Sequence, residues 1–211
     1  MARRLKPWDT MVKSFEISMN NPELFWFLVL LMSGLILFLV GVLLLFFSVA
    51  SLHVLSLFIG AVIMLASLVL LMGGIGGTIL YAERLVKRKK ASVWTIMKKG
   101  ITESPRLSLA YVLEQGFIML GLLLLIIPGL IVAVRLSLVT PACILEKKGL
   151  GIKRSWRATK GNSWQIALLL LVWGLIFMLF AIIPFFIVAS FLLLPVYLVN
   201  LTLVYLQLKK K

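Results

Sequence analysis

The stretch "LFWFLVLLMSGLILFLVGVLLLFFSVASLHVLSLFIGAVIMLASLVLLMGGIGGTILYA" (residues 24–82) decides the fold, because it contains no charged side chain. A helix needs about 20 apolar residues to cross a bilayer, so this run is long enough to cross twice. Three serines and His53 gather in its middle, at 48–56, where we expect the chain to turn. Its first half is longer than the apolar region of a signal peptide, which has about 7–15 residues, and we predict a retained span.

The composition of the whole chain extends this interpretation. Of its 211 residues 62% are hydrophobic, and the mean hydropathy is +1.12. Soluble domains are only about 45–50% apolar, so we predict an all-α polytopic membrane protein. Cys143 and His53 are single residues of their kind. They predict no disulfide framework, no metal site and no cofactor.

Two further apolar blocks follow the first. Residues 107–145 carry only Glu114 and Arg135 as charges, and Pro128 with Gly129 interrupts them. Such a pair ends one helix and lets the chain turn. Residues 161–208 carry no charge and break near Pro184. The pattern predicts one transmembrane domain (1–211) of six spans in three hairpins, at about 24–48, 55–82, 107–127, 130–145, 163–183 and 186–208.

The basic residues predict the orientation of these spans. The chain has 22 Lys and Arg against 7 Asp and Glu, for a net charge of +15. Every basic residue except Arg135 falls in 1–13, 83–106, 147–160 or 209–211. In a soluble protein such an excess would suggest nucleic acid as partner. Between spans it follows the rule that cytoplasmic loops collect Lys and Arg, so we predict a plasma-membrane protein with both termini in the cytoplasm.

The segments between the hairpins resemble one another. Phe15 precedes "NN", Trp94 precedes "KKG" and Trp156 precedes "KGN", each directly before an apolar hairpin. The turns "IIPGLIVAV" and "IIPFFIVAS" are also similar. Either a unit of surface helix plus hairpin is used three times, as in many transporters, or apolar helices resemble each other by chance. The interfacial helices are predicted at about 10–20, 88–99 and 150–161.

The segment "KKGLGIKRSWRATKGNSWQI" (147–166) predicts a helix that lies on the membrane. At helical spacing Ile152, Ser155 and Trp156 share one face, while the basic side chains gather on the other. A Trp-bearing face opposite a basic face is typical of a helix in the headgroup region. Nucleic-acid binding is disfavoured because the segment is tethered between two spans, and catalysis lacks an acid, base or nucleophile. The predicted headgroup-binding residues are Lys153, Arg154, Trp156, Arg157 and Lys160.

Arg135 is the most costly residue for the bilayer, since it lies within a predicted span. An arginine at this depth is a functional candidate. Alternatively, it reaches the outer headgroups or donates to open carbonyls near Pro141 or Pro195. Antiparallel geometry about the predicted turn places Glu114 too deep to pair with it, and we expect Glu114 near the cytoplasmic interface beside Lys147 or Lys148.

Two other features concern helix packing. Asn200 gives the sixth span a weak polar stripe, which favours interhelical hydrogen bonding over a substrate path. The "GGIGG" stretch lies inside a helix, so it is not a phosphate-binding loop. Gly73 and Gly77 are four residues apart, and small residues at this spacing predict close helix packing or a local kink.

Residues 122–166 resemble the membrane domain attached to some glycerophosphodiester phosphodiesterases and related stand-alone membrane proteins. The similarity rests on the turn at 127–129, Arg135, Pro141, Glu146 and the run 154–162. The resemblance implies a multi-span helical bundle. It does not imply phosphodiesterase activity, because this chain has no room for a catalytic barrel of about 250 residues.

Together these patterns predict a non-enzymatic integral membrane protein. It would bind anionic lipid and organise or support a membrane protein complex or homo-oligomer, without nucleic acid. The alternative is a small transporter or lipid-handling protein with a path near Arg135 and Asn200. A membrane-embedded enzyme is disfavoured because the sequence holds no cluster of His, Asp, Glu or Cys.

Overall fold

The computed structural model describes residues 6–51, 54–89, 92–146, 149–182 and 187–209. Within these ranges every regular element is helical and no strand occurs, which confirms the predicted all-α class. The helices are α1 (Pro7–Met19), the 3₁₀ helix η1 (Pro22–Phe25), α2 (Trp26–Ser51), α3 (Val54–Val86), α4 (Val93–Leu124), α5 (Ile126–Leu136), α6 (Val139–Leu145), α7 (Ile152–Thr159), α8 (Ser163–Ile182) and α9 (Ile187–Lys209).

Several of these helices have the length and composition of membrane spans. Among the described residues five stretches qualify: Pro22–Ser48, Val54–Val86, Val93–Leu123, Ile126–Leu145 and Leu192–Lys209. Helices α7 and α8 together make a sixth candidate, which is bent by 105° at the break between them. The protein is therefore an all-helical protein with about five helices suited to a bilayer.

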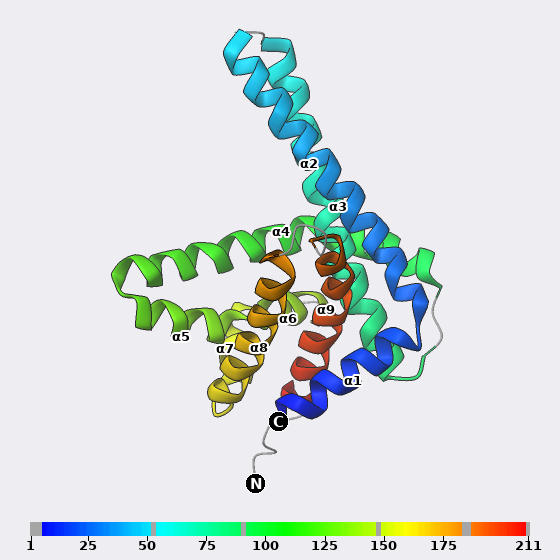
Figure 1. Ribbon diagram of the computed structural model, residues 1–211, viewed down its shortest axis with the longest axis vertical. Helices are drawn as coiled ribbons and strands as arrows, with labels where there is room; N and C mark the ends of the chain where they lie inside the picture. The colour runs from blue at the N-terminus through cyan, green and yellow to red at the C-terminus, as the bar shows by residue number, and fades with distance from the viewer. Residues whose placement is uncertain (1–5, 52–53, 90–91, 147–148, 183–186, 210–211) are drawn as a thin grey trace.

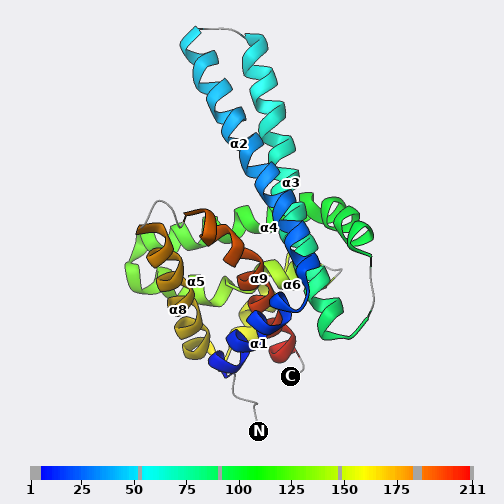
Figure 2. The ribbon, with the colours of Figure 1, turned by 45° about the vertical axis from the view of Figure 1, so that its right-hand side comes forward.

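The arrangement of the helices is uneven. Helices α2 and α3 form a long antiparallel hairpin that extends beyond the other elements, and α4 and α5 form a second hairpin that extends to one side (Figures 1 and 2). The remaining helices pack at the base of the first hairpin. Helix α9 lies among them, in contact with α1, α2, α3, α6, α7 and α8. The buried core therefore surrounds α9 and the C-terminal half of α3.

The "GGIGG" stretch lies where α2, α3 and α4 meet. A Cβ atom on Gly100 of α4 would lie 2.4 Å from the carbonyl oxygen of Gly73 and 2.8 Å from the nitrogen of Gly77. A Cβ on Gly77 would lie 2.6 Å from the ring of Phe27 in α2. Because real Cβ atoms do not approach so closely, only glycine lets these backbones pack at their observed separation.

Helix α4 differs from the sequence prediction, because residues 93–99 of the predicted interfacial helix and residues 107–124 of the predicted span belong to one continuous helix. Pro105 lies inside it and has no N–H to donate to the carbonyl of Ile101. The hydroxyl of Ser104 donates to that carbonyl instead, at 2.7 Å. The helix therefore continues through a residue that normally interrupts one.

The reversal between α4 and α5 also differs from the prediction. It occurs at Leu125, whose backbone is extended (φ −168°, ψ 147°), and not at Pro128 and Gly129. Pro128 falls in the first turn of α5, where a backbone N–H has no acceptor within the helix. Gly129 serves close packing, since a Cβ on Gly121 would lie 2.9 Å from its Cα. The predicted span at 130–145 is divided between the end of α5 and α6.

Two of the predicted surface segments are helices. Helix α1 covers most of the predicted segment 10–20, and α7 covers most of 150–161. Helix α1 packs on α8 and α9, with Phe15 stacked on Trp173 at a centroid distance of 5.9 Å. The predicted turns at His53 and Pro184 lie outside the described residues.

Candidate functional site

Helix α7 begins in close contact with α6. Its N-cap is Gly151, with a φ of +80° that side-chain-bearing residues rarely adopt. A Cβ at this position would lie 2.7 Å from the nitrogen of Cys143 and 2.8 Å from the carbonyl oxygen of Val139. Both the backbone conformation and the available space therefore require glycine here.

One face of α7 packs on the C-terminal end of α5. The hydroxyl of Ser155 donates to the carbonyl oxygen of Arg135 at 2.7 Å. The hydroxyl of Thr159 donates to the Trp156 carbonyl at 3.1 Å and reaches the Arg135 carbonyl at 3.5 Å. Both hydroxyl residues are fully buried. They provide donors for a carbonyl in the last turn of α5, which has no partner within its own helix.

The side chain of Arg135 lies against the same helix. Its guanidinium carbon is 5.4 Å from the ring centroid of Trp156, a distance typical of a cation–π contact. Arg135 is half-buried, and Trp156 is 44% exposed. The structure thus brings together Arg135 and the Trp of α7, which sequence analysis treated as separate candidates.

The four basic residues of α7 and its C-cap have different environments. Lys153, Arg157 and Lys160 are exposed. Arg154 is half-buried, and its Nε lies 2.7 Å from Oε2 of Glu146. Three of the predicted headgroup-binding cations are therefore on the surface, while the fourth contributes to an internal ion pair.

Glu146, at the end of α6, joins several elements. Its Oε1 lies 3.3 Å from Nζ of Lys209 and accepts a hydrogen bond from the hydroxyl of Tyr205, both in α9. The guanidinium of Arg106 in α4 donates to the Glu146 carbonyl oxygen at 2.6 Å. We call Arg106, Glu146, Arg154, Tyr205 and Lys209 the Glu146 cluster. It connects α4, α6, α7 and α9 through polar contacts.

The electrostatics of the cluster favour an ionised carboxylate. Burial tends to raise the pKa of Glu146. Hydrogen bonds from Tyr205 and Lys209, with the nearby charges of Lys209 and Arg154, more than offset it and hold the pKa below its ordinary value of 4.5. Sequence reasoning named Glu146 only through a family resemblance. A signal was present, because it is the only acidic residue after Glu114.

Two other predicted polar residues are buried. Glu114 is 7% exposed, on a face of α4 that also buries Leu107 and Ala110. Its Oε2 has no hydrogen-bond partner within the described ranges. The predicted neighbours Lys147 and Lys148 lie outside those ranges.

Asn200 of α9 is fully buried. Neither polar atom of its side chain has a hydrogen-bond partner in the part of the chain that the structure describes. The expected interhelical hydrogen bond is therefore not found there. Among the same residues, no three His, Cys, Asp or Glu side chains lie close enough together to hold a metal ion.

The fold and these contacts define an all-helical protein with several candidate membrane-spanning helices. A family model, Domain of unknown function (DUF7847), matches residues 106–208. This region is just under half of the chain, and it contains the described helices α5 to α8 as well as most of α9. Every member of the Glu146 cluster except Lys209 lies in it. No curated protein and no solved structure matches the chain.

Proposed function

We propose that this protein is a non-enzymatic, multi-pass protein of the plasma membrane that binds anionic lipid and organises or supports a membrane protein complex. The proposal includes six spans in three hairpins, with α8 as the fifth span, α7 on the membrane surface before it, and both termini in the cytoplasm. The five candidate spans and the bent pair, of which α8 is the apolar part, support this number of crossings by their length and composition. The restriction of basic residues to alternate connections supports the orientation.

The observation that carries the proposal is the convergence of basic side chains on Glu146, two at its carboxylate and one at its backbone carbonyl. Arg106, Arg154 and Lys209 come from three helices to Glu146. Arg106 also pairs with Glu103 at 3.4 Å, so three cations meet two carboxylates, and the exposed Lys153, Arg157 and Lys160 add to the excess. Each Lys or Arg close to an anionic leaflet contributes about 1 kcal/mol of attraction. A lipid surface of negative charge fits this arrangement.

Trp156 supports a position at the membrane surface. Its ring is partly exposed beside the basic side chains of α7, and the guanidinium of Arg135 lies over it. Trp is enriched at the boundary between headgroups and hydrocarbon. Helices α5, α6 and α9 all contact α7 and fix its position in the bundle, which supports a constant depth for its charges.

The test removes the exposed charges of α7 without touching the Glu146 cluster. The variant Lys153→Gln/Arg157→Gln/Lys160→Gln should retain less phosphatidylglycerol in native mass spectrometry, and the difference should shrink as salt is raised. The matched control is Lys153→Arg/Arg157→Lys/Lys160→Arg, which keeps every charge and should bind as the parent does. Equal lipid retention by the parent and the three-Gln variant would contradict a lipid role for α7.

The proposed partner complex requires a separate experiment. Purification from native membranes in mild detergent, followed by mass spectrometry, should recover the same protein partner with the parent and with the charge-preserving control. Recovery of this chain alone, as a monomer, would contradict the organising role. The lipid-binding part of the proposal would then still stand. The similarity of residues 122–166 to a phosphodiesterase-attached membrane domain stays a prediction.

The alternative, a small transporter, is favoured by one observation: Glu114 and Asn200 are buried with unpartnered polar atoms among the described residues. Carboxyl groups within spans carry protons in many transporters. Arg135, predicted to line the same path, has its guanidinium over the Trp156 ring. Proteoliposomes with an internal pH-sensitive dye would decide, since a transporter should show a proton flux that Glu114→Gln abolishes.

A further inference from the structure

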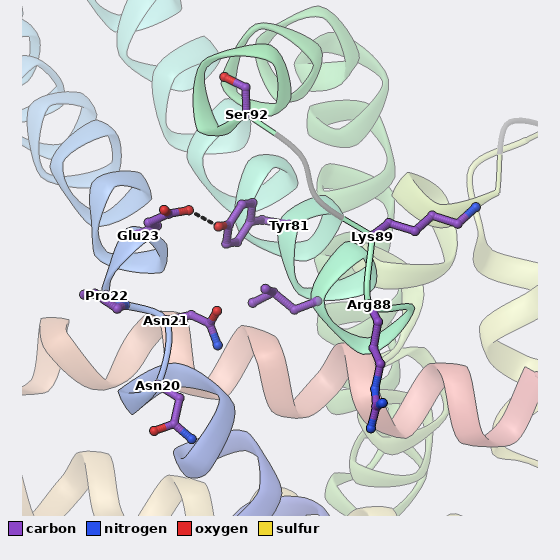
Figure 3. Close-up of a pocket in the computed structure, with 9 residues that line it drawn as sticks. Asn20, Asn21, Pro22, Glu23, Tyr81, Arg88, Lys89 and Ser92 are labelled. Carbon is purple, nitrogen blue, oxygen red and sulfur yellow. Dashed lines mark hydrogen bonds between the residues drawn. The ribbon is translucent and has the colours of Figure 1, made fainter.

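A polar cleft of about 660 Å³ lies where the end of α3 faces the connection between α1 and η1. Figure 3 shows Asn20 and Glu23 on one side of it, Arg88 and Lys89 after the end of α3, and Ser92 directly before α4. The hydroxyl of Tyr81 donates to the carboxylate of Glu23 and holds it in place. The cleft thus combines two cations, one fixed carboxylate and neutral polar groups.

An apolar groove of about 550 Å³ lies beside the cleft, between the beginning of α2 and the beginning of α4. Trp26 and Trp94 line it, at 62% and 63% exposure, together with Leu30 and Met97. Glu23 borders both the cleft and the groove. Paired Trp residues are typical of the depth where headgroups meet hydrocarbon. The two hollows therefore offer neighbouring places for a polar head and an apolar chain.

The conformation of Arg88 sets this residue apart. Helix α3 ends with the Arg88 N–H donating to the Leu85 carbonyl at 3.0 Å and the Lys89 N–H donating to the Arg84 carbonyl at 2.9 Å. These two hydrogen bonds define a Schellman motif, in which the left-handed residue is usually glycine. Arg88 occupies that position with a φ of +53°. A residue held in a conformation that suits glycine better is a reason to look for a role of its side chain.

The charge of the cleft selects a class of ligand. Neither Arg88 nor Lys89 has an ion-pair partner in the described part of the chain, whereas the neighbouring Lys87 pairs with Glu83 at 2.5 Å. Two cations and the Glu23 carboxylate leave one net positive charge, which matches the single negative charge of a phosphodiester. Ser92 makes no side-chain capping bond, and the first N–H groups of α4 also attract anions.

We propose that the cleft binds the phosphodiester of a membrane phospholipid and that the groove holds one of its acyl chains. Arg88 and Lys89, whose side chains extend in different directions from the cleft in Figure 3, supply the positive charge that attracts the phosphate, and Trp26 and Trp94 flank the chain. The site rests on the proposed function as a lipid-binding membrane protein, but it shares no residue with α7. It predicts one tightly retained lipid in addition to the diffuse attraction of a charged surface.

The test uses Arg88→Gly and Arg88→Asn, because both residues tolerate the left-handed conformation and remove the charge. Native mass spectrometry of the full chain with phosphatidylglycerol should show one retained lipid, with affinity lowered on the order of fivefold in each variant. Arg88→Gly should unfold at the same or a higher temperature than the parent. Loss of lipid without loss of stability separates a ligand contact from a structural one.

The matched control is Lys87→Gln, which removes an adjacent charge that does not line the cleft and should leave the retained lipid unchanged. Trp94→Ala should weaken the binding of the lipid but not the binding of glycerol 3-phosphate, which has no acyl chain. If glycerol 3-phosphate displaces the lipid at equal concentration, the site takes a free phosphate and the chain groove is excluded. The proposal would be overturned if both Arg88 variants retained as much lipid as Lys87→Gln does. This outcome does not depend on how much lipid the α7 variants retain.

Discussion

The guanidinium carbon of Arg135 lies 5.4 Å from the centroid of the Trp156 ring, and this contact joins the end of α5 to α7. A hydrogen bond supports this contact, because the backbone carbonyl of Arg135 in α5 accepts from the hydroxyl of Ser155 in α7. An arginine that would be costly in hydrocarbon is thereby placed against an aromatic face at the edge of the bundle. The basic helix and the arginine act as one structural unit.

This contact predicts an energetic coupling between the two residues. Arg135→Leu and Trp156→Ala should each destabilise the protein, and the double variant should lose less than the sum of the two. The coupling should be about 0.5–2 kcal/mol, the range of cation–π contacts at exposed to desolvated sites. Unfolding in detergent measures it, with Trp164→Ala as control for the loss of a 72%-exposed indole. Strict additivity would show that Arg135 and Trp156 act independently.

The Glu146 cluster predicts a pH dependence of stability. The pKa of Glu146 is lowered in the folded protein. The ionised Glu146 carboxylate therefore contributes fully to the free energy of unfolding above about pH 4.5, and this contribution is lost as pH falls through the lower, folded-state pKa. Glu146→Gln should destabilise the protein by about 1–3 kcal/mol at neutral pH and flatten this acid-induced loss. Glu16→Gln, which removes an exposed carboxylate, should change neither quantity. The same acid slope in the parent and in Glu146→Gln would contradict the assignment.

The close contact between α3 and α4 predicts that two glycine substitutions in α4 change the stability of the protein very differently. Gly100→Ala places a Cβ 2.4 Å from the Gly73 carbonyl oxygen and should destabilise the protein by about 1–3 kcal/mol. Gly116→Ala meets nothing within 4 Å and should stabilise α4 by about 0.5–1 kcal/mol. Thermal unfolding in detergent compares them. Similar midpoints would show that the helices separate easily at this point.

The six-span proposal predicts the sides from which single cysteines are labelled. In a Cys143→Ser background, Ser51→Cys and Ser92→Cys should react from opposite faces of sealed vesicles. Lys209→Cys should react from the same face as Ser92→Cys, since an even number of spans returns the chain to its starting side. Labelling of the cysteines at 51 and 92 from one side would exclude the α2–α3 hairpin as two spans.

Local features of the sequence were sufficient to predict the helical class and the long hairpin of α2 and α3. Hydropathy acts on each stretch separately, so a charge-free run of residues 24–82 predicts long apolar helices without knowledge of their neighbours. The periodicity of 150–161 predicted α7 for the same reason. Gly73 and Gly77 lie in close helix contacts, as predicted. This could be predicted because the spacing of two glycines on one helix face is also a local property of the sequence.

The tertiary structure decided which of these elements meet. Glu146 and Tyr205 are 59 residues apart in the chain and share a hydrogen bond, and Arg106 reaches the Glu146 carbonyl from 40 residues away. No local pattern determines such pairs, because they depend on how α4, α6 and α9 pack. The reversal at Leu125 is similar. Pro128 and Gly129 are compatible with a turn or with the first turn of a helix, and the close packing of Gly121 against Gly129 selects the second.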